Sequence, residues 1–170
     1  MQTRINVRSV SMIGVLVALE MVLTRFLTIH TWNLKIGFSF VPVVVAAILY
    51  GPVTAGLVAA IGDVIAAVLF PVGAFFPGFT LSAFLTGIVF GLFLKKSQSA
   101  VRIAGSVVAA QFVISQILNT YWIAFLYGSP YLPLFATRIY QTAVMTVVES
   151  VSIYLIAKKL IPVLRQFEQN

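Results

Sequence analysis

The sequence contains no cysteine, one histidine and only four acidic residues in 170 positions. Without cysteine the chain can form no disulfide, no thiolate metal site and no thiol nucleophile. One histidine and four carboxylates spread along the chain also leave no cluster of ligands for a metal ion. We therefore predict that the protein holds neither a metal nor another cofactor.

Two catalytic motifs are absent as well. The chain lacks the Gly-rich loop ending in Gly-Lys-Ser/Thr that cradles nucleotide phosphates, so it cannot hydrolyse ATP by that route. It also lacks the Gly-x-Ser-x-Gly turn that presents a nucleophilic serine. We expect no catalytic residues and no enzymatic activity.

Charged residues are scarce, whereas apolar residues are abundant. Only 9% of the residues are charged, 61% are hydrophobic, and the mean hydropathy is +1.06. A soluble domain of this size could not hide so much apolar surface, because small domains leave much of their chain near water. We therefore expect the protein to be surrounded by lipid. In that setting the net charge of +7 indicates the cytoplasmic flanks of a membrane protein rather than nucleic-acid binding.

The apolar residues form six runs, separated by glycines, prolines and charged clusters. A helix needs about 20 apolar residues to cross a bilayer, or fewer where the bilayer is thinned. We predict an all-α membrane protein, a compact bundle of six transmembrane helices that forms a single domain over residues 1–170. The second run is short and could instead be re-entrant or buried; the first lacks the signature of a cleavable leader, so we expect it in the mature protein. The predicted spans are residues 5–26, 36–50, 53–70, 77–94, 101–126 and 136–164.

The basic residues gather on one side of such a bundle. With six spans, both termini share a side with the turn at residues 51–52 and the loop at residues 95–102. The positive-inside rule makes this side cytoplasmic, so we expect both termini in the cytoplasm. Eight of the eleven basic residues lie on this side: Arg4, Arg8, Lys95, Lys96, Arg102, Lys158, Lys159 and Arg165.

Three cations, Arg25, Lys35 and Arg138, are left on the outer side, near loops rich in aromatic residues, glycine and proline. Together they would attract an anion such as a carboxylate, and each arginine could bind it through two N–H groups. The alternative is that their side chains extend to the lipid headgroups. We treat all three as candidates for binding an anionic ligand.

Three acids lie inside predicted spans. A carboxylate within a membrane is costly enough to suggest a function, and Asp63 could accept two parallel N–H donors from a ligand. The alternative is that Asp63 pairs with Arg25 or Arg138. We interpret Glu20 and Glu149 as structural acids that bond between helices.

Aromatic and amide side chains are candidates for the walls of a ligand site. Asn119 and Trp122 fall at the outer end of the fifth predicted span, and Phe75 and Phe79 can reach the same side. Their rings could stack on a planar ligand, although aromatic residues at a membrane interface are commonly anchors. Asn119 needs hydrogen-bond partners if its amide is buried.

Gly14 and Ala18 on the first predicted helix stand four positions apart, a spacing that lets another helix approach closely. They are therefore candidates for docking a partner. The alternative is packing inside the bundle, because the third and fourth predicted helices carry small residues at similar spacing. Those residues are Ala55, Ala59, Gly62, Ala83 and Gly87.

Four stretches share a pattern with a known family: Arg25-Phe26, residues 34–38 (LKIGF), the Tyr50-Gly51-Pro52 turn before Gly62-Asp63, and residues 70–91 (FPVGAFFPGFTLSAFLTGIVFG). They resemble the substrate-binding S components of energy-coupling factor (ECF) transporters, and the folate-specific S component most closely. The resemblance covers residues 25–94 well, whereas the last two helices match mainly in layout.

The resemblance implies a membrane-embedded binding protein rather than a complete transporter. Such a subunit binds its vitamin tightly from outside and docks on a transmembrane T component that carries two cytoplasmic ATPases. The family docks through an Ala-xxx-Ala motif on the first helix, for which this chain has Gly14-Val-Leu-Val-Ala18. The expected partners are therefore a vitamin, the T component, the ATPases and the lipid bilayer of a bacterial plasma membrane.

If the vitamin is folate, the resemblance implies three kinds of contact. Folate has a pterin edge with adjacent donors, flat rings, and a glutamate tail with two carboxylates, which call for acceptors, aromatic walls and cations. The eight candidates for these contacts are Arg25, Lys35, Asp63, Phe75, Phe79, Asn119, Trp122 and Arg138. The alternatives are an S component for another vitamin, such as pantothenate or a thiamine precursor, a small channel or facilitator, and an integral-membrane enzyme.

Overall fold

The computed structural model describes residues 7–30, 35–71, 73 and 75–169, so that Arg4 and Trp32 lie outside the described part. The helices and strands are α1 (Val7–Phe26), β1 (Thr28–His30), β2 (Lys35–Gly37), α2 (Phe40–Leu49), α3 (Pro52–Leu69), α4 (Pro77–Leu94), α5 (Ala100–Val108), η1 (Ala109–Asn119), α6 (Thr120–Tyr127), α7 (Tyr131–Leu155), η2 (Ile156–Leu160) and α8 (Ile161–Gln169). The η segments are π-helical and continue directly from their neighbours. Counting α5–η1–α6 and α7–η2–α8 as one helix each, the prediction of an all-helical bundle of six helices is confirmed.

Four helices of the described chain are long and apolar enough to cross a membrane: α1, α3, α4 and the continuous α5–η1–α6 segment. The second predicted span is wrong in length, because α2 has only ten residues. At a rise of ~1.5 Å per residue it extends ~15 Å, about half of the hydrocarbon core. Residues 35–37 pair with β1 in an antiparallel hairpin instead of extending the helix. The alternative of a buried segment is what the structure shows, because Val44, Ala46 and Ala47 are fully buried.

Helices α3 and α4 pack closely through the small residues that the sequence analysis noted. A Cβ atom added at Gly87 would lie 2.4 Å from the carbonyl oxygen of Ala55, and one added at Gly91 would lie 2.1 Å from the Cα of Pro52. Side chains are excluded at both positions because the neighbouring atoms belong to the backbone. Small residues of α3 and α4 therefore serve packing inside the bundle.

The sixth helix begins earlier than predicted, at Tyr131 rather than at residue 136. The predicted span left residues 131–135 in a loop. Pro130 directly precedes the helix and Pro133 lies in its first turn, where the missing N–H group costs no intrahelical hydrogen bond. The connection between α6 and α7 is correspondingly short.

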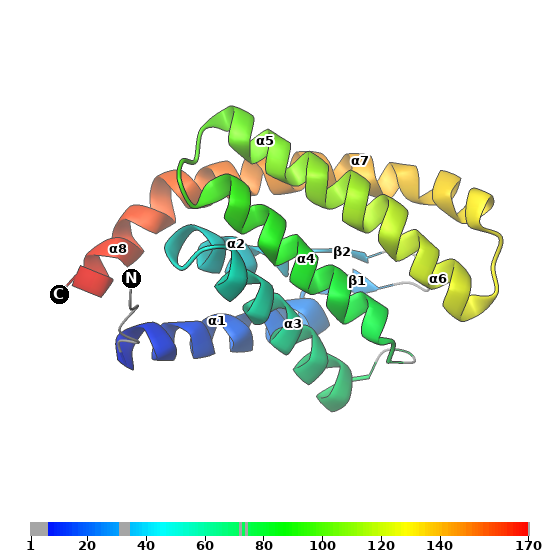
Figure 1. Ribbon diagram of the computed structural model, residues 1–170, viewed down its shortest axis with the longest axis horizontal. Coiled ribbons are helices and arrows are strands. Elements are labelled where there is room, and N and C mark those ends of the chain that lie inside the picture. The colour runs from blue at the N-terminus through cyan, green and yellow to red at the C-terminus, as the bar shows by residue number, and fades with distance from the viewer. Residues whose placement is uncertain (1–6, 31–34, 72, 74, 170) are drawn as a thin grey trace.

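The connections divide between the two ends of the bundle (Figure 1). The start of α1, the end of α8, the α2–α3 turn and the α4–α5 connection lie at the left end of the view. The α3–α4 and α6–α7 connections lie at the right end. The end that holds the chain termini is therefore the one that also holds the basic α4–α5 connection, as the charge pattern predicts.

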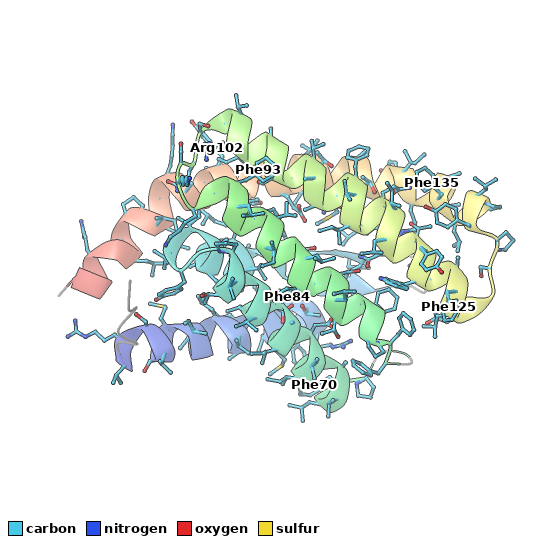
Figure 2. The ribbon with its side chains drawn as sticks, in the orientation of Figure 1. Phe70, Phe84, Phe93, Arg102, Phe125 and Phe135 are labelled. Carbon is cyan, nitrogen blue, oxygen red and sulfur yellow. The ribbon has the colours of Figure 1, made fainter. Side chains whose placement is uncertain are left out.

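The outside of the bundle is apolar and several polar side chains are inside it. Large apolar side chains such as Phe70 and Phe125 stay exposed on the ribbon's exterior (Figure 2). Glu20, Gln141 and Glu149, by contrast, are at least 95% buried. A soluble protein has the opposite distribution, so the fold is that of a multi-pass membrane protein with a polar interior.

Candidate functional site

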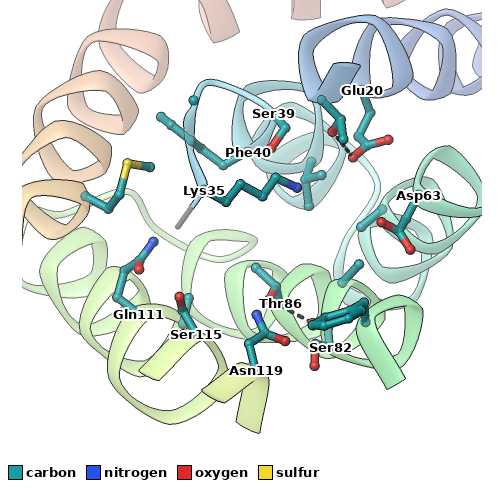
Figure 3. A pocket seen from close by; sticks show the side chains of 18 of the residues that line it. Glu20, Lys35, Ser39, Phe40, Asp63, Ser82, Thr86, Gln111, Ser115 and Asn119 are labelled. Carbon is teal, nitrogen blue, oxygen red and sulfur yellow. Dashed lines mark hydrogen bonds between the residues drawn. The ribbon is translucent and has the colours of Figure 1, made fainter. Parts of the chain in front are cut away.

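A cavity of about 590 Å³ lies between α1, the β1–β2 hairpin, α2, α3, α4, η1 and α7. Its size is within the range of small-molecule sites, which span roughly 300–1,000 Å³. Glu20, Lys35 and Asp63 enter it from one side and Gln111 and Asn119 from the other (Figure 3). Seven of the eight residues predicted for the ligand site line this cavity: Arg25, Lys35, Asp63, Phe75, Phe79, Asn119 and Arg138.

The three outer cations line the part of the cavity nearest the hairpin, which we call the loop end. Arg25 is in the last turn of α1, Lys35 is the first residue of β2, and Arg138 lies early in α7. The Arg138 Nη2 group donates to the carbonyl oxygen of Ser115, 3.2 Å away. Gln141 Nε2 donates to the carbonyl oxygen of Lys35 at 2.8 Å and so fixes the hairpin against α7. Three positive charges held in this way can bind an anionic group of a ligand.

Two acids face the cavity from α1 and α3. The hydroxyl of Thr24 donates to Glu20 Oε1 at 2.8 Å, and the hydroxyl of Thr80 donates to Asp63 Oδ2 at 2.8 Å. Glu20 lies so close to α3 that a Cβ atom at Gly62 would be 1.9 Å from its Oε2 atom. The glycine therefore makes room for an acid that the sequence analysis considered purely structural.

An aromatic wall is built by the α3–α4 connection and the start of α4. Phe75, Phe76 and Phe79 all line the cavity, and the rings of Phe76 and Phe79 meet edge to face with centroids 5.9 Å apart. Trp122 lies behind this wall: its ring is 5.4 Å from that of Phe76, and its Nε1 donates to the hydroxyl of Ser82 at 3.1 Å. The structure therefore does not bring Trp122 to the lining, although it supports two residues that are there.

The π-helical segment η1 places a row of polar side chains on the cavity. Gln111, Ser115 and Asn119 follow one another at intervals of four and all line it. Asn119 Oδ1 is buried without a hydrogen-bond partner among the described residues. π-Helical segments are frequent at functional sites, and this one carries the candidate amide of the sequence analysis.

Gln111 and Glu149 form the end of the cavity farthest along α7 from the hairpin, which we call the deep end. Gln111 Nε2 donates to Glu149 Oε1 at 2.7 Å. The exposed fractions of these side chains are 7% and 5%. Within the described part of the chain, Gln111 Oε1 and Glu149 Oε2 have no partner. The deep end therefore offers unused acceptor atoms.

Several polar lining residues were missed by the sequence analysis. Their common signal is a spacing of three or four positions in otherwise apolar helices, which puts them on one helix face. Reading the polar residues as stripes, rather than singly, would have found them. They include Ser82 and Thr86 on α4 and Gln111 and Ser115 on η1.

The candidate docking residues on α1 are not part of the cavity lining. Gly14 and Ala18 are both exposed, and a Cβ atom at Gly14 would meet no described atom within 4 Å. The alternative of packing inside the bundle is therefore not what the structure shows for these two residues. Docking itself stays a prediction.

Comparison with known proteins places this architecture in a family. The model of the ECF-type riboflavin transporter S component family matches residues 4–166. The chain belongs to this family of S components. A protein named "Folate transporter FolT" from Clostridium novyi is 39% identical over 140 residues, which cover 82% of this chain and 81% of the relative. Another of the same name from Leuconostoc mesenteroides is 35% identical over 126 residues, covering 73% and 68%.

A solved structure also matches this chain. It is described as the crystal structure of FolT bound with folic acid, and it superposes with a TM-score of 0.86 at 32% identity. The match covers 91% of this chain and 95% of the other. The resemblance inferred from residues 25–94 thus extends over the whole helical bundle, and the protein is a membrane component of a transport system rather than a member of an enzyme family.

Proposed function

We propose that this S component captures folate in its cavity for import across the bacterial plasma membrane. The observation that carries the proposal is the composition of the cavity, which joins three cations at the loop end to an aromatic wall. Arg25, Lys35 and Arg138 would hold the two carboxylates of the glutamate tail. Phe75 and Phe79 would contact the flat rings. The FolT relatives and the folic-acid-bound FolT structure support the same ligand.

Riboflavin is the second candidate, because the matching family model is described by that vitamin. It is uncharged and carries no carboxylate, so it would form no ion pair with Arg25, Lys35 or Arg138 of the loop end. Folate carries two carboxylates, which can form charge-assisted hydrogen bonds with such cations. The electrostatics of the lining therefore favour folate.

The transport role depends on partners of the S component. We propose that the end of the bundle holding the chain termini faces the cytoplasm, since the basic residues gather there. The exposed small residues Gly14 and Ala18 would dock α1 on a T component, which carries two ATPases. The S component would then supply binding and no catalysis, and ATP hydrolysis by its partners would drive release inward.

Titration of the detergent-solubilised protein with folic acid tests the ligand. We expect saturable one-to-one quenching of Trp122 fluorescence, because its ring lies 5.4 Å from Phe76 of the lining. The measurement uses a Trp32→Phe background so that one tryptophan reports. Riboflavin, pantothenate and thiamine at a hundredfold excess are expected to leave the folate titration unchanged. Binding of one of these vitamins without folate would overturn the ligand, and no binding of any would favour a channel or facilitator.

Replacing Ala18 with leucine tests the docking face. Ala18 is exposed and does not line the cavity, so folate affinity should stay unchanged. Extra bulk at a close helix contact costs about 1–3 kcal/mol, so we expect the association with the T component to weaken about 5- to 150-fold, and folate uptake to fall with it. Ala136→Leu, on the exposed surface of α7, is the matched control and should retain both. Equal losses in the two variants would contradict docking through α1.

A further inference from the structure

A second hollow lies apart from the central cavity, on the surface of the bundle between α5 and α7. Its volume is about 270 Å³, and we call it the α5–α7 groove. It is lined by Ala100, Ile103 and Ala104 of α5 and by Ser150, Val151 and Tyr154 of α7. Most of these side chains are apolar and exposed, so the groove opens towards the surroundings of the bundle. In a membrane protein those surroundings are lipid, and an acyl chain is the molecule at hand to fill such a groove.

A cation stands at one end of the groove. Helices α5 and α7 run antiparallel, so the start of α5 and the end of α7 lie together at the end of the bundle that holds the chain termini (Figure 1). Lys158 lies on η2, four residues beyond Tyr154, and its Nζ atom is 4.4 Å from the centre of the Tyr154 ring. This cation–π contact holds an ammonium group beside a residue that lines the groove.

The charge at this end is complementary to an anion. Three of the four acids in the chain, Glu20, Asp63 and Glu149, line the central cavity instead. Arg102 is directed towards α4, because its Nη1 group donates to the carbonyl oxygen of Phe93 at 3.3 Å. Lys158 is therefore the cation that the structure places at the groove. Basic sites between membrane helices bind the headgroups of anionic lipids, and an ammonium group can donate to phosphate oxygens.

A phospholipid fits the groove better than a protein partner does. The lining spans little more than one turn of each helix, ~6 Å, whereas a specific protein interface buries at least about 1,000 Å². The candidate docking residues Gly14 and Ala18 are on α1, which runs along the bottom of the view while α5 and α7 run along the top (Figure 1). Docking through α1 would therefore leave the groove in contact with lipid.

We propose that the α5–α7 groove binds one anionic phospholipid. Its acyl chain lies against Ala104, Ser150 and Val151, and its phosphate is held by the ammonium group of Lys158. Tyr154 stands between the two parts, as tyrosines do where the hydrocarbon core meets the headgroups. The site is outside the central cavity and needs no vitamin, so it does not depend on the proposed function.

Native mass spectrometry of the detergent-solubilised protein tests the headgroup contact. Phosphatidylglycerol, which is anionic, and phosphatidylcholine with the same acyl chains are titrated separately. We expect one phosphatidylglycerol to bind about fivefold more tightly than phosphatidylcholine, and Lys158→Gln to abolish this preference, because a cation near an anionic headgroup contributes about that factor. Lys158→Arg keeps the charge and the contact with the Tyr154 ring, and should keep the preference. Lys159→Gln removes the neighbouring exposed charge of η2 and is the matched control, which should also keep it.

Replacing Ala104 with leucine tests the acyl-chain contact. The larger side chain fills the groove, so we expect both lipids to bind about tenfold more weakly. Ala136→Leu, on the exposed surface of α7 and outside the groove, is the matched control and should bind both lipids normally. The residues changed at the groove do not line the central cavity, so folic acid titration reports whether each variant is folded.

Three results overturn the inference and leave the proposed function intact. The first is equal affinity of the unmodified protein for the two lipids. The second is an equal loss of phosphatidylglycerol binding in Lys158→Gln and Lys159→Gln, which would mean that the basic end attracts anionic lipid without a site. The third is a dimer in the mass spectrum that Ala104→Leu dissociates, since the groove would then hold a second copy of the chain.

Discussion

Replacing Gly87 with alanine is expected to lower the melting temperature of the detergent-solubilised protein by about 10 °C. The added methyl group would lie 2.4 Å from the Ala55 carbonyl oxygen and 2.5 Å from the backbone nitrogen of Gly56. Backbone cannot rotate away as a flexible side chain can, so α3 and α4 must separate. Overpacking of this kind costs about 3 kcal/mol, and ~3 °C is lost per kcal/mol in a chain of this size.

Gly14→Ala is the matched control for this change. The same methyl group at Gly14 would meet no described atom within 4 Å, and alanine has the higher helix propensity by roughly 1 kcal/mol. Its melting temperature should therefore be unchanged or slightly higher. Melting followed by circular dichroism compares both variants with the unmodified protein. A similar melting temperature for Gly87→Ala would mean that α3 and α4 can pack without this close approach.

The small residues illustrate what a sequence does and does not determine about packing. Gly14 and Ala18 have the same spacing as the small residues of α3 and α4, and the sequence analysis could not separate docking from internal contact. The structure separates them, since Gly87 touches the backbone of α3 and Gly14 touches nothing described. The spacing predicts a surface for close approach, but only the neighbouring helices decide what approaches it.

The membrane class, the number of helices and the outer cations and Asp63 of the cavity followed from the sequence because each rests on a local pattern. Long apolar runs predict helices whatever their partners, and an ion within such a run is costly enough to indicate a function. Asp63 was found in this way, and Arg25, Lys35 and Arg138 were found because the positive-inside rule does not explain their position. All four line the cavity.

The errors concern features that depend on tertiary contacts. Residues 35–37 pair with β1 instead of extending α2, and no local sequence pattern predicts that pairing. Trp122 was predicted to line the cavity, but it packs behind Phe76, which lines the cavity in its place. The prediction that Glu149 bonds between helices is confirmed, but its partner Gln111 is 38 residues away and could not be named from the sequence. Which acids keep an unused oxygen can be judged only once all neighbours are known.

Replacing Arg138 with glutamine is expected to raise the Kd for folic acid about a hundredfold. Arg138 is 4% exposed and lines the loop end of the cavity, so in the proposed complex its charge would meet the ligand's carboxylate away from water. Removing one member of a buried, hydrogen-bonded charge pair costs about 2–5 kcal/mol, and 2.7 kcal/mol corresponds to about a hundredfold in Kd. Titration by tryptophan fluorescence, as above, measures the change.

Arg102→Gln is the control that separates binding from structural support. Like Arg138, Arg102 donates to a backbone carbonyl of a helix, that of Phe93 at 3.3 Å, but it lies outside the cavity lining. The Arg102→Gln variant should therefore bind folic acid with the same Kd as the unmodified protein. The dimethyl ester of folic acid adds a second control, because it keeps the rings and removes both negative charges. It should bind the unmodified protein and Arg138→Gln with similar, weak affinity. If Arg138→Gln weakens the ester as much as the acid, then Arg138 supports the shape of the cavity through the Ser115 carbonyl, and the anion is held by Arg25 and Lys35.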